Sequence, residues 1–136
     1  MNQSQAELIA ALSRIVGDDK VKTDAESLST FGKDWTKVYE PHPAVIVFPS
    51  SVEQVQEIVR YANLHQLALV PSGGRTGLSG GAVASNGEIV VAFDRMNKIL
   101  DFDATDRQVV CQAGVVTEQL QNFAEEKQLF YPVDFA

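Results

Sequence analysis

The sequence predicts an α+β protein in which a helical lead-in precedes a small parallel βαβ sheet and the start of a second, largely antiparallel part. Two short apolar runs, at residues 45–48 and 67–70, flank an amphipathic helical pattern, as in a βαβ unit. A glycine-rich stretch follows the second run directly. Two further strand-like runs, at 98–102 and 107–112, are separated by a short polar turn, which is typical of an antiparallel hairpin.

The first part of the chain reads as helical. Residues 4–7 form a capping box, in which Ser and Glu satisfy each other's backbone donors, and Gly17 is a natural helix stop. Either Thr23 or Asp24 is expected to cap a second short helix. We therefore expect residues 1–42 to be a helical lead-in.

Residues 43–94 carry the expected βαβ subdomain. The run 45–48 is continuously apolar, which indicates a strand buried on both faces, and the second run is expected to be buried too. Ser50 or Ser51 is expected to cap the intervening helix. A third strand is expected over residues 88–93. The inner face of the helix is expected to consist of Val52, Val55, Ile58, Val59 and Ala62.

Residues 95–136 are expected to begin a second subdomain that the chain does not complete. The hairpin is followed by a helix that Thr117 is expected to cap. Its apolar face would present Leu120, Phe123 and Ala124. A last short strand is expected over residues 129–133.

The stretch 71–82 holds five of the nine glycines in the chain. Glycines this dense leave backbone N–H groups unshielded, and N–H groups turned to one side form a concave anion site. Ser72, Thr76 and Ser79 add hydroxyl groups, and Arg75 adds a guanidinium group suited to phosphate oxygens. The pattern favours a phosphate-binding loop, and a flexible surface loop is the alternative.

Two common phosphate motifs do not fit. No Gly-Lys-Ser/Thr follows the first glycines, which excludes a P-loop. The dinucleotide fingerprint requires a helix after the glycines, but here residues 83–87 form a turn that leads to another apolar run. The expected order is strand, glycine loop, strand.

Composition narrows the function further. The net charge of −7, without any basic cluster, argues against nucleic-acid binding. The single cysteine, Cys111, fits a reducing compartment and is expected to be a small buried residue. The sequence supports no metal site and no catalytic triad, and no apolar run approaches the length of a membrane span.

We expect a cytoplasmic protein, with peripheral attachment at the inner membrane as the alternative. Trp35 and Tyr39 are expected to pack at the surface, with lining of a site as the alternative.

Five segments in order resemble a known family. They are the glycine stretch, Pro43–Val55, Asp94–Ile99, Val110–Val115 and Tyr131–Asp134. Together they are similar to the PCMH-type FAD-binding domain of oxidases of the vanillyl-alcohol oxidase type. Within that family the chain resembles the D-lactate and D-2-hydroxyglutarate dehydrogenases and the glycolate oxidase flavin subunit.

The resemblance implies a flavin-dependent enzyme that oxidises a D-2-hydroxy acid of the lactate, glycolate or 2-hydroxyglutarate type by hydride transfer to FAD. Some relatives attach FAD covalently through a His near this loop, where the present chain has Arg75, so noncovalent FAD is expected. Relatives are several times longer, so the chain is expected to be an N-terminal fragment, inactive alone, without assignable catalytic residues. Its oligomeric state, and whether it binds FAD by itself, stay open. The residues expected to bind the cofactor are Ser72, Gly73, Gly74, Arg75, Thr76, Gly77, Leu78, Ser79, Gly80, Pro132 and Asp134.

Two other functions compete with this hypothesis. One is a free-standing nucleotide- or phosphate-binding module without catalysis. The other is a folded interaction domain in which the glycine stretch is only a linker.

Overall fold

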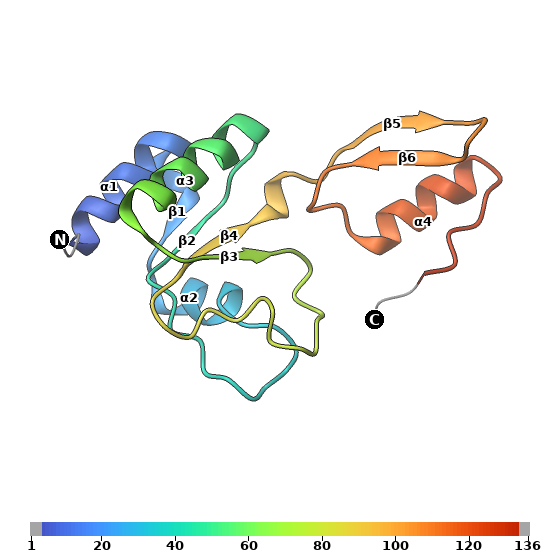
Figure 1. The fold of residues 1–136 in the computed structure, drawn as a ribbon. Coiled ribbons are helices and arrows are strands. Elements are labelled where there is room, and N and C mark those ends of the chain that lie inside the picture. Colours follow the sequence, from blue (N-terminus) through green and yellow to red (C-terminus); the bar gives the residue numbers. More distant parts are fainter. Residues whose placement is uncertain (1–3, 134–136) are drawn as a thin grey trace.

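A computed structural model describes residues 4–133, which form two lobes joined by a single crossing of the chain (Figure 1). The N-terminal lobe, residues 4–95, holds a four-stranded sheet with helices on both faces. The C-terminal lobe, residues 96–133, holds a two-stranded hairpin and one helix. No helix in the described range is both long and apolar enough to span a bilayer.

The sheet of the N-terminal lobe has the strand order β1-β2-β4-β3. Strands β2 (Val45–Val47) and β3 (Leu69–Ser72) both pair in parallel with β4 (Ile89–Ala92), which lies between them. Strand β1 (Val21–Lys22) pairs antiparallel with β2 at the other edge. The three expected strands are therefore present and parallel. The lead-in contributes a fourth strand, β1, which is only two residues long and was not predicted.

The expected burial and end of the second strand were wrong. Strand β3 is an edge strand in which Leu69 and Val70 are only partly buried, Pro71 is exposed and Ser72 alone is buried. The strand also extends past the predicted run 67–70, because Pro71 pairs with Val91 and Ser72 with Ala92. An edge position explains both findings, because one side of an edge strand needs no backbone donors and tolerates proline.

Helices cover both faces of this sheet (Figure 1). Helices α1 (Gln5–Val16) and α3 (Val52–His65) share one face, and α2 (Ala25–Phe31) lies on the other. A 3-10 turn, η1 (Asp18–Lys20), connects α1 to β1. Alternate strand residues face the two layers, as strand geometry requires. The first layer buries Leu8, Leu12, Val16, Val45, Val47, Ile58, Ile89 and Val91, and the second buries Ile46, Phe48, Ala84, Val90 and Ala92.

The predicted helix ends are confirmed at three helices. Ser4 and Glu7 form the capping box of α1, and Gly17 ends that helix at a φ of 97°. Asp24 caps α2 by accepting from the Ser27 N–H group. Ser51 caps α3.

The inner face of α3 is narrower than expected. Ile58 and Ala62 are buried and Val55 is half-buried, but Val52 and Val59 are 56% and 41% exposed. Val55, Ile58 and Ala62, spaced three and four residues apart, form the stripe that faces the sheet, and the two exposed valines lie together on one side of it.

The C-terminal lobe is reached through a 3-10 turn, η2 (Phe93–Arg95), after β4. Strands β5 (Ile99–Asp103) and β6 (Gln108–Cys111) form the expected antiparallel hairpin, with an irregularity in register between Ile99 and Asp101. Helix α4 (Thr117–Glu126) covers one face, where Phe123 meets Phe102 edge-on at 5.6 Å between ring centroids.

Three expectations about this lobe were wrong. Thr117 is the first helical residue, and the cap position is occupied by Val116, which has no capping side chain. Residues 129–133 form no strand. Cys111, the last residue of β6, is an exposed free thiol.

The C-terminal lobe buries little of its apolar surface. No residue of α4 is buried, and Leu100 and Phe130 are 59% and 87% exposed. A half-open cavity of about 370 Å³ lies between hairpin and helix, lined by Phe102, Leu120, Phe123 and Tyr131 among others. A lobe of fewer than about 40 residues is too small to close a core of its own.

Candidate functional site

The glycine loop leaves the sheet at the carboxyl end of its parallel strands. Ser72, the last residue of β3, pairs with Ala92, the last residue of β4. The loop after β3 and the turn after β4 therefore start side by side at the carboxyl ends of these strands (Figure 1). Ligands of open α/β sheets characteristically bind just outside these carboxyl ends.

The loop presents a run of uncommitted backbone donors. Within the described residues, nothing accepts a hydrogen bond from the seven consecutive N–H groups of Gly73 to Ser79. Gly74 has no atom within 4 Å of the place where a Cβ would stand, and Gly73 has only the Ala113 carbonyl oxygen, at 3.9 Å. Free donors beside glycines with open space above them are what an anion in close contact requires.

The loop turns at two residues with positive φ. One is Gly80, at 76°, where glycine is at ease. The other is Arg75, at 59°, in the left-handed region that non-glycine residues rarely adopt. A residue held there is over-determined by its surroundings.

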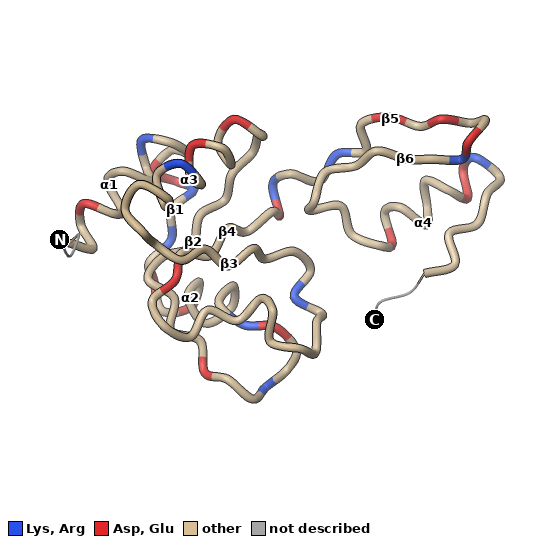
Figure 2. Tube along the Cα trace, viewed as in Figure 1, with Lys and Arg blue, Asp and Glu red and all other residues tan. Residues whose placement is uncertain are grey.

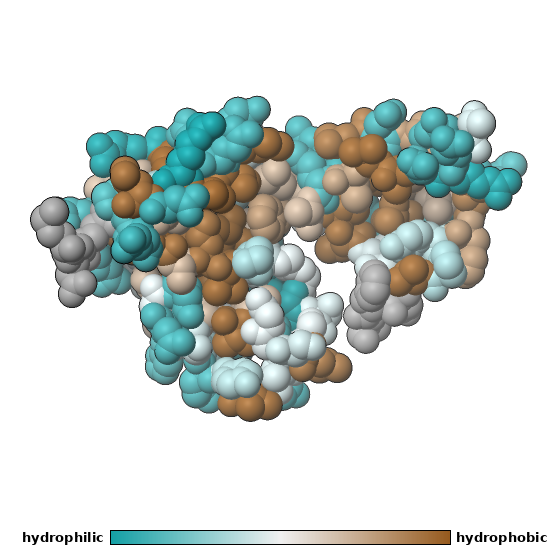
Figure 3. Space-filling model, in the orientation of Figure 1, coloured by the Kyte–Doolittle hydropathy of each residue, from teal (hydrophilic) through white to brown (hydrophobic). Residues whose placement is uncertain are grey.

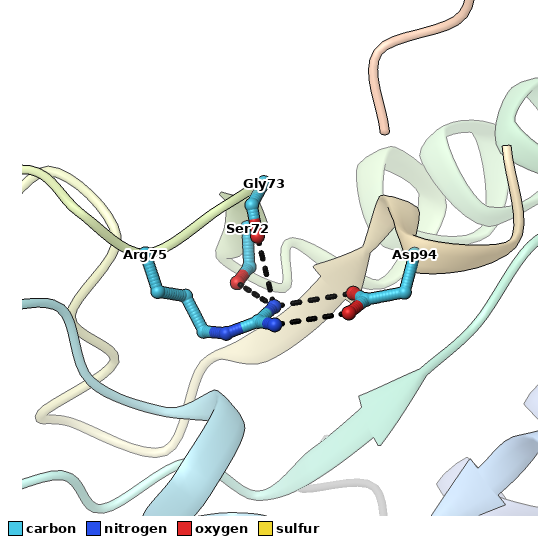
Figure 4. A network of polar contacts seen from close by, with 4 residues as sticks. All are labelled: Ser72, Gly73, Arg75 and Asp94. Atoms are coloured by element: carbon cyan, nitrogen blue, oxygen red, sulfur yellow. Dashed lines mark hydrogen bonds and ion pairs between the residues drawn. The ribbon is translucent and has the colours of Figure 1, made fainter. Parts of the chain in front are cut away.

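Arg75 is held by a network of polar contacts at the end of the sheet (Figure 4). Its Nη1 donates to the Gly73 carbonyl oxygen at 2.8 Å, to Ser72 Oγ at 3.4 Å and to Asp94 Oδ2 at 3.1 Å. Its Nη2 donates to Asp94 Oδ1 at 2.9 Å, which completes a bidentate ion pair. The guanidinium carbon also lies 4.7 Å from the ring centroid of Phe31.

The predicted loop residues differ in what they offer a ligand. The Ser72 side chain is fully buried and its hydroxyl group accepts from Arg75, so it faces the interior of the loop. Gly74, Thr76, Gly77, Leu78 and Ser79 are exposed, Leu78 at 70%.

Asp34 contacts the far end of the glycine loop, although no sequence pattern indicated this role. Its residue is only 7% exposed, and its carboxylate accepts from the Thr36 hydroxyl and from the Thr36 N–H at 2.9 Å. The Thr36 hydroxyl lowers the pKa of Asp34 most; burial opposes this, while the N–H groups of Thr36, Ala82 and Gly80 lower it further. The far end of the glycine loop thus already faces a protein carboxylate.

The segment around Asp34 also brings aromatic residues to the loop. The Trp35 N–H donates to the Gly77 carbonyl oxygen at 3.1 Å, and the Tyr39 ring would lie 3.1 Å from a Cβ on Gly80. Both aromatic rings stay largely exposed, at 62% and 57%. An aspartate two residues before a threonine is a turn signal, but no local pattern places that turn under a loop forty residues away.

The two predicted residues near the C-terminus are not brought to the loop by any described contact. Pro132 is exposed and lies in the extended segment after α4, in the other lobe. Asp134 lies outside the described residues.

A notch separates the two lobes, and the pale, weakly polar residues of the glycine loop line one side of it (Figure 3). Charges are scattered over both lobes without a basic stripe, and Arg75 is the single charge between residues 71 and 87 (Figure 2). Because Asp94 pairs with Arg75, the hydrogen-bond donors left at the carboxyl ends of the strands are mainly backbone N–H groups. Among the described residues, no cluster of three His, Cys, Asp or Glu could hold a metal ion.

Comparison with known proteins shows which family the chain belongs to. Residues 43–136 match the model of the FAD binding domain family. The chain belongs to this family. The resemblance inferred from the sequence is thereby confirmed, and FAD is the cofactor that the family binds.

Curated relatives agree with this membership. The chain is 65% identical over 129 residues to the D-2-hydroxyglutarate dehydrogenase of Stutzerimonas stutzeri, covering 95% of this chain and 28% of the relative. It is 52% identical over 128 residues to the D-2-hydroxyglutarate dehydrogenase of Xanthomonas citri pv. viticola, covering 94% and 27%. The chain therefore spans little more than a quarter of the length of these relatives.

Solved structures confirm the fold. The chain superposes on p-cresol methylhydroxylase with a TM-score of 0.80 at 24% identity, covering 95% of this chain and 26% of that one. It superposes on a 4-ethylphenol oxidase from Gulosibacter chungangensis with a TM-score of 0.81 at 25% identity, covering 94% and 26%. The α+β class and the PCMH-type arrangement, with its parallel and antiparallel parts, are as predicted.

Proposed function

We propose that the amides of Gly73 to Ser79 bind the diphosphate of FAD in a dehydrogenase that oxidises a D-2-hydroxy acid. The observation that carries the proposal is the run of seven backbone N–H groups without an acceptor, at the carboxyl edge of a parallel sheet in an FAD binding domain. The substrate class rests on the relatives named D-2-hydroxyglutarate dehydrogenase.

In this proposal the protein orients the cofactor, and FAD supplies the hydride chemistry. Backbone N–H groups hold a dianionic bridge without adding a charged side chain, and the missing Cβ at Gly74 allows contact with its oxygens. The hydroxyl groups of Thr76 and Ser79 lie exposed beside these amides and can donate as well. The Ser72 hydroxyl and the Gly80 amide act behind the loop, on Arg75 and Asp34.

Several finer points belong to the same proposal. FAD is held noncovalently, since the described loop carries Arg75 where some relatives attach flavin through His. Pro132 and Asp134 approach the flavin side of the cofactor in the parent protein. Residues 1–42, 43–94 and 95–136 are successive parts of one FAD-binding domain, although β1 joins the first part to the sheet of the second. The parent works in the cytoplasm; nothing in the described residues supports attachment to a membrane.

The test uses the full-length parent protein. Purified without added cofactor, it should show the absorbance of oxidised flavin, or gain it on addition of FAD. Anaerobic D-2-hydroxyglutarate should bleach this absorbance, while the L enantiomer should not. A parent that binds ADP or pyrophosphate but not FAD would instead support the phosphate-binding module.

A further inference from the structure

We propose that Arg75 is a positioning residue that fixes the diphosphate loop through Asp94, and that it does not itself bind the phosphates. This inference rests on the proposed function, because it assigns a role within the same loop. It also departs from the sequence-based expectation, which placed the guanidinium group on phosphate oxygens.

The first argument is that the side of the guanidinium group formed by Nη1 and Nη2 is already engaged, since both nitrogens donate to protein acceptors. Both hydrogens of Nη1 are shared among three acceptors, and Nη2 completes the fork on Asp94. A bidentate Arg–carboxylate pair is among the strongest side-chain contacts, and turning the guanidinium toward a ligand would leave the carboxylate unpaired. The face of the group is also in contact with Phe31.

The second argument is the backbone of Arg75 itself. Its φ of 59° is a conformation that costs free energy in a residue with a Cβ. The return bond from its side chain to the Gly73 carbonyl oxygen closes a short ring around Gly74. This ring fixes the direction of the loop where the free amides begin, and so reduces the backbone freedom that glycines would otherwise keep.

The third argument concerns what Asp94 joins. It follows β4 directly and lies in η2, the turn that leads into the C-terminal lobe. The ion pair therefore ties the loop after β3 to the crossing between lobes, with the side chains 22% and 36% exposed. A loop tied at this point presents its amides at a fixed place relative to both walls of the notch.

The two roles predict opposite effects of removing Asp94. If Arg75 bound phosphate, Asp94→Asn would free the guanidinium group and remove a negative charge near a dianion, so FAD would bind as tightly or more tightly. If Arg75 positions the loop, Asp94→Asn loosens the amides and weakens FAD binding, about tenfold for a loss comparable to one hydrogen bond to a charged group.

The experiment measures FAD affinity of the full-length parent by flavin fluorescence titration for wild type, Arg75→Ala, Asp94→Asn and the double variant. Arg95→Ala and Asp106→Asn are matched controls, because each removes one exposed charge without a side-chain contact to the loop. We expect both single variants to lose about tenfold in affinity, the double variant to lose no more than either, and both controls to bind like wild type. Additive losses, or tighter binding by Asp94→Asn, would overturn the proposal.

Two readouts guard against a general folding defect. The ³¹P spectrum of bound FAD, measured at saturating FAD, should change in the same way in Arg75→Ala and in Asp94→Asn, because both variants release the same loop; a change in Arg75→Ala that Asp94→Asn does not share would assign Arg75 to the phosphates. Asp94→Glu, which keeps the carboxylate, should recover part of the affinity lost by Asp94→Asn; no recovery together with an unchanged unfolding temperature would count against the tie. If wild type itself fails to bind FAD, the proposed function fails, which is a different result from any of these.

Discussion

Gly114 lies against the carbonyl group of Phe93 so closely that a Cβ on Gly114 would overlap its oxygen atom. The Gly114 N–H also donates to the Met96 carbonyl oxygen at 2.8 Å. The contact joins the segment after β6 to the turn after β4, and thereby fixes the C-terminal lobe beside the glycine loop. Residue 114 must be glycine for the two lobes to meet in this way.

Gly114→Ala should therefore open the junction between the lobes. We expect a loss of about 1–3 kcal/mol in the free energy of unfolding, as for other overpacked sites, measured by denaturant titration of the full-length parent. Gly81→Ala is the control, since no atom lies within 4 Å of its Cβ position and its φ is not positive. Equal stability of the two variants would show that the junction yields without cost.

Gly74→Ala should separate binding from folding. Its Cβ would meet no protein atom, so the unfolding temperature should stay that of wild type. If the FAD diphosphate rests on this side of the loop, the methyl group should weaken FAD binding about tenfold, the equivalent of about 1.4 kcal/mol. Wild-type affinity in this variant would mean that the phosphates bind elsewhere.

Asp34→Asn should make the free energy of unfolding depend less on pH in the acid range. The pKa of Asp34 is lower in the folded than in the unfolded chain, chiefly through the Thr36 hydroxyl, so the folded state binds fewer protons. Its contribution is fully present above the unfolded value of about 3.9 and is lost as pH falls through the folded value. Unfolding titrations from pH 7 downward should show the two proteins converging below about pH 4; a constant difference across that range would exclude this role for the Asp34 charge.

Noncovalent attachment of FAD gives a simple prediction about the parent. Acid precipitation should release all flavin into the supernatant and leave a colourless pellet. A yellow pellet that survives washing in denaturant would show a covalent bond and contradict the prediction.

The sequence predicted those parts of the fold that depend on local pattern. Periodicity located α1, α3 and the hairpin β5–β6. Cap chemistry located Ser4 and narrowed the other two caps to Thr23 or Asp24 and to Ser50 or Ser51, of which the structure uses Asp24 and Ser51. Which strand lies at an edge is a property of the whole sheet, so the insertion of β4 between β2 and β3 and the exposure of β3 could not be derived from the strands alone.

The candidate site shows the same division. Dense glycines after a strand pointed to the loop, because backbone freedom is encoded in the residues themselves. The partners that hold the loop, Asp34 from below and Asp94 from the side, come from distant segments and carry no local signal of that role. The sequence therefore pointed to the amides of this loop, whereas it assigned Arg75 by its charge alone, without the carboxylate that pairs with it.

Hydrogen exchange of the peptide spanning Gly73 to Ser79 tests the central claim most directly. In the full-length parent these amides should exchange rapidly without FAD, because no described group accepts from them, and slowly once FAD saturates the protein. Fast exchange in both states, with FAD demonstrably bound, would contradict the claim that this loop holds the diphosphate.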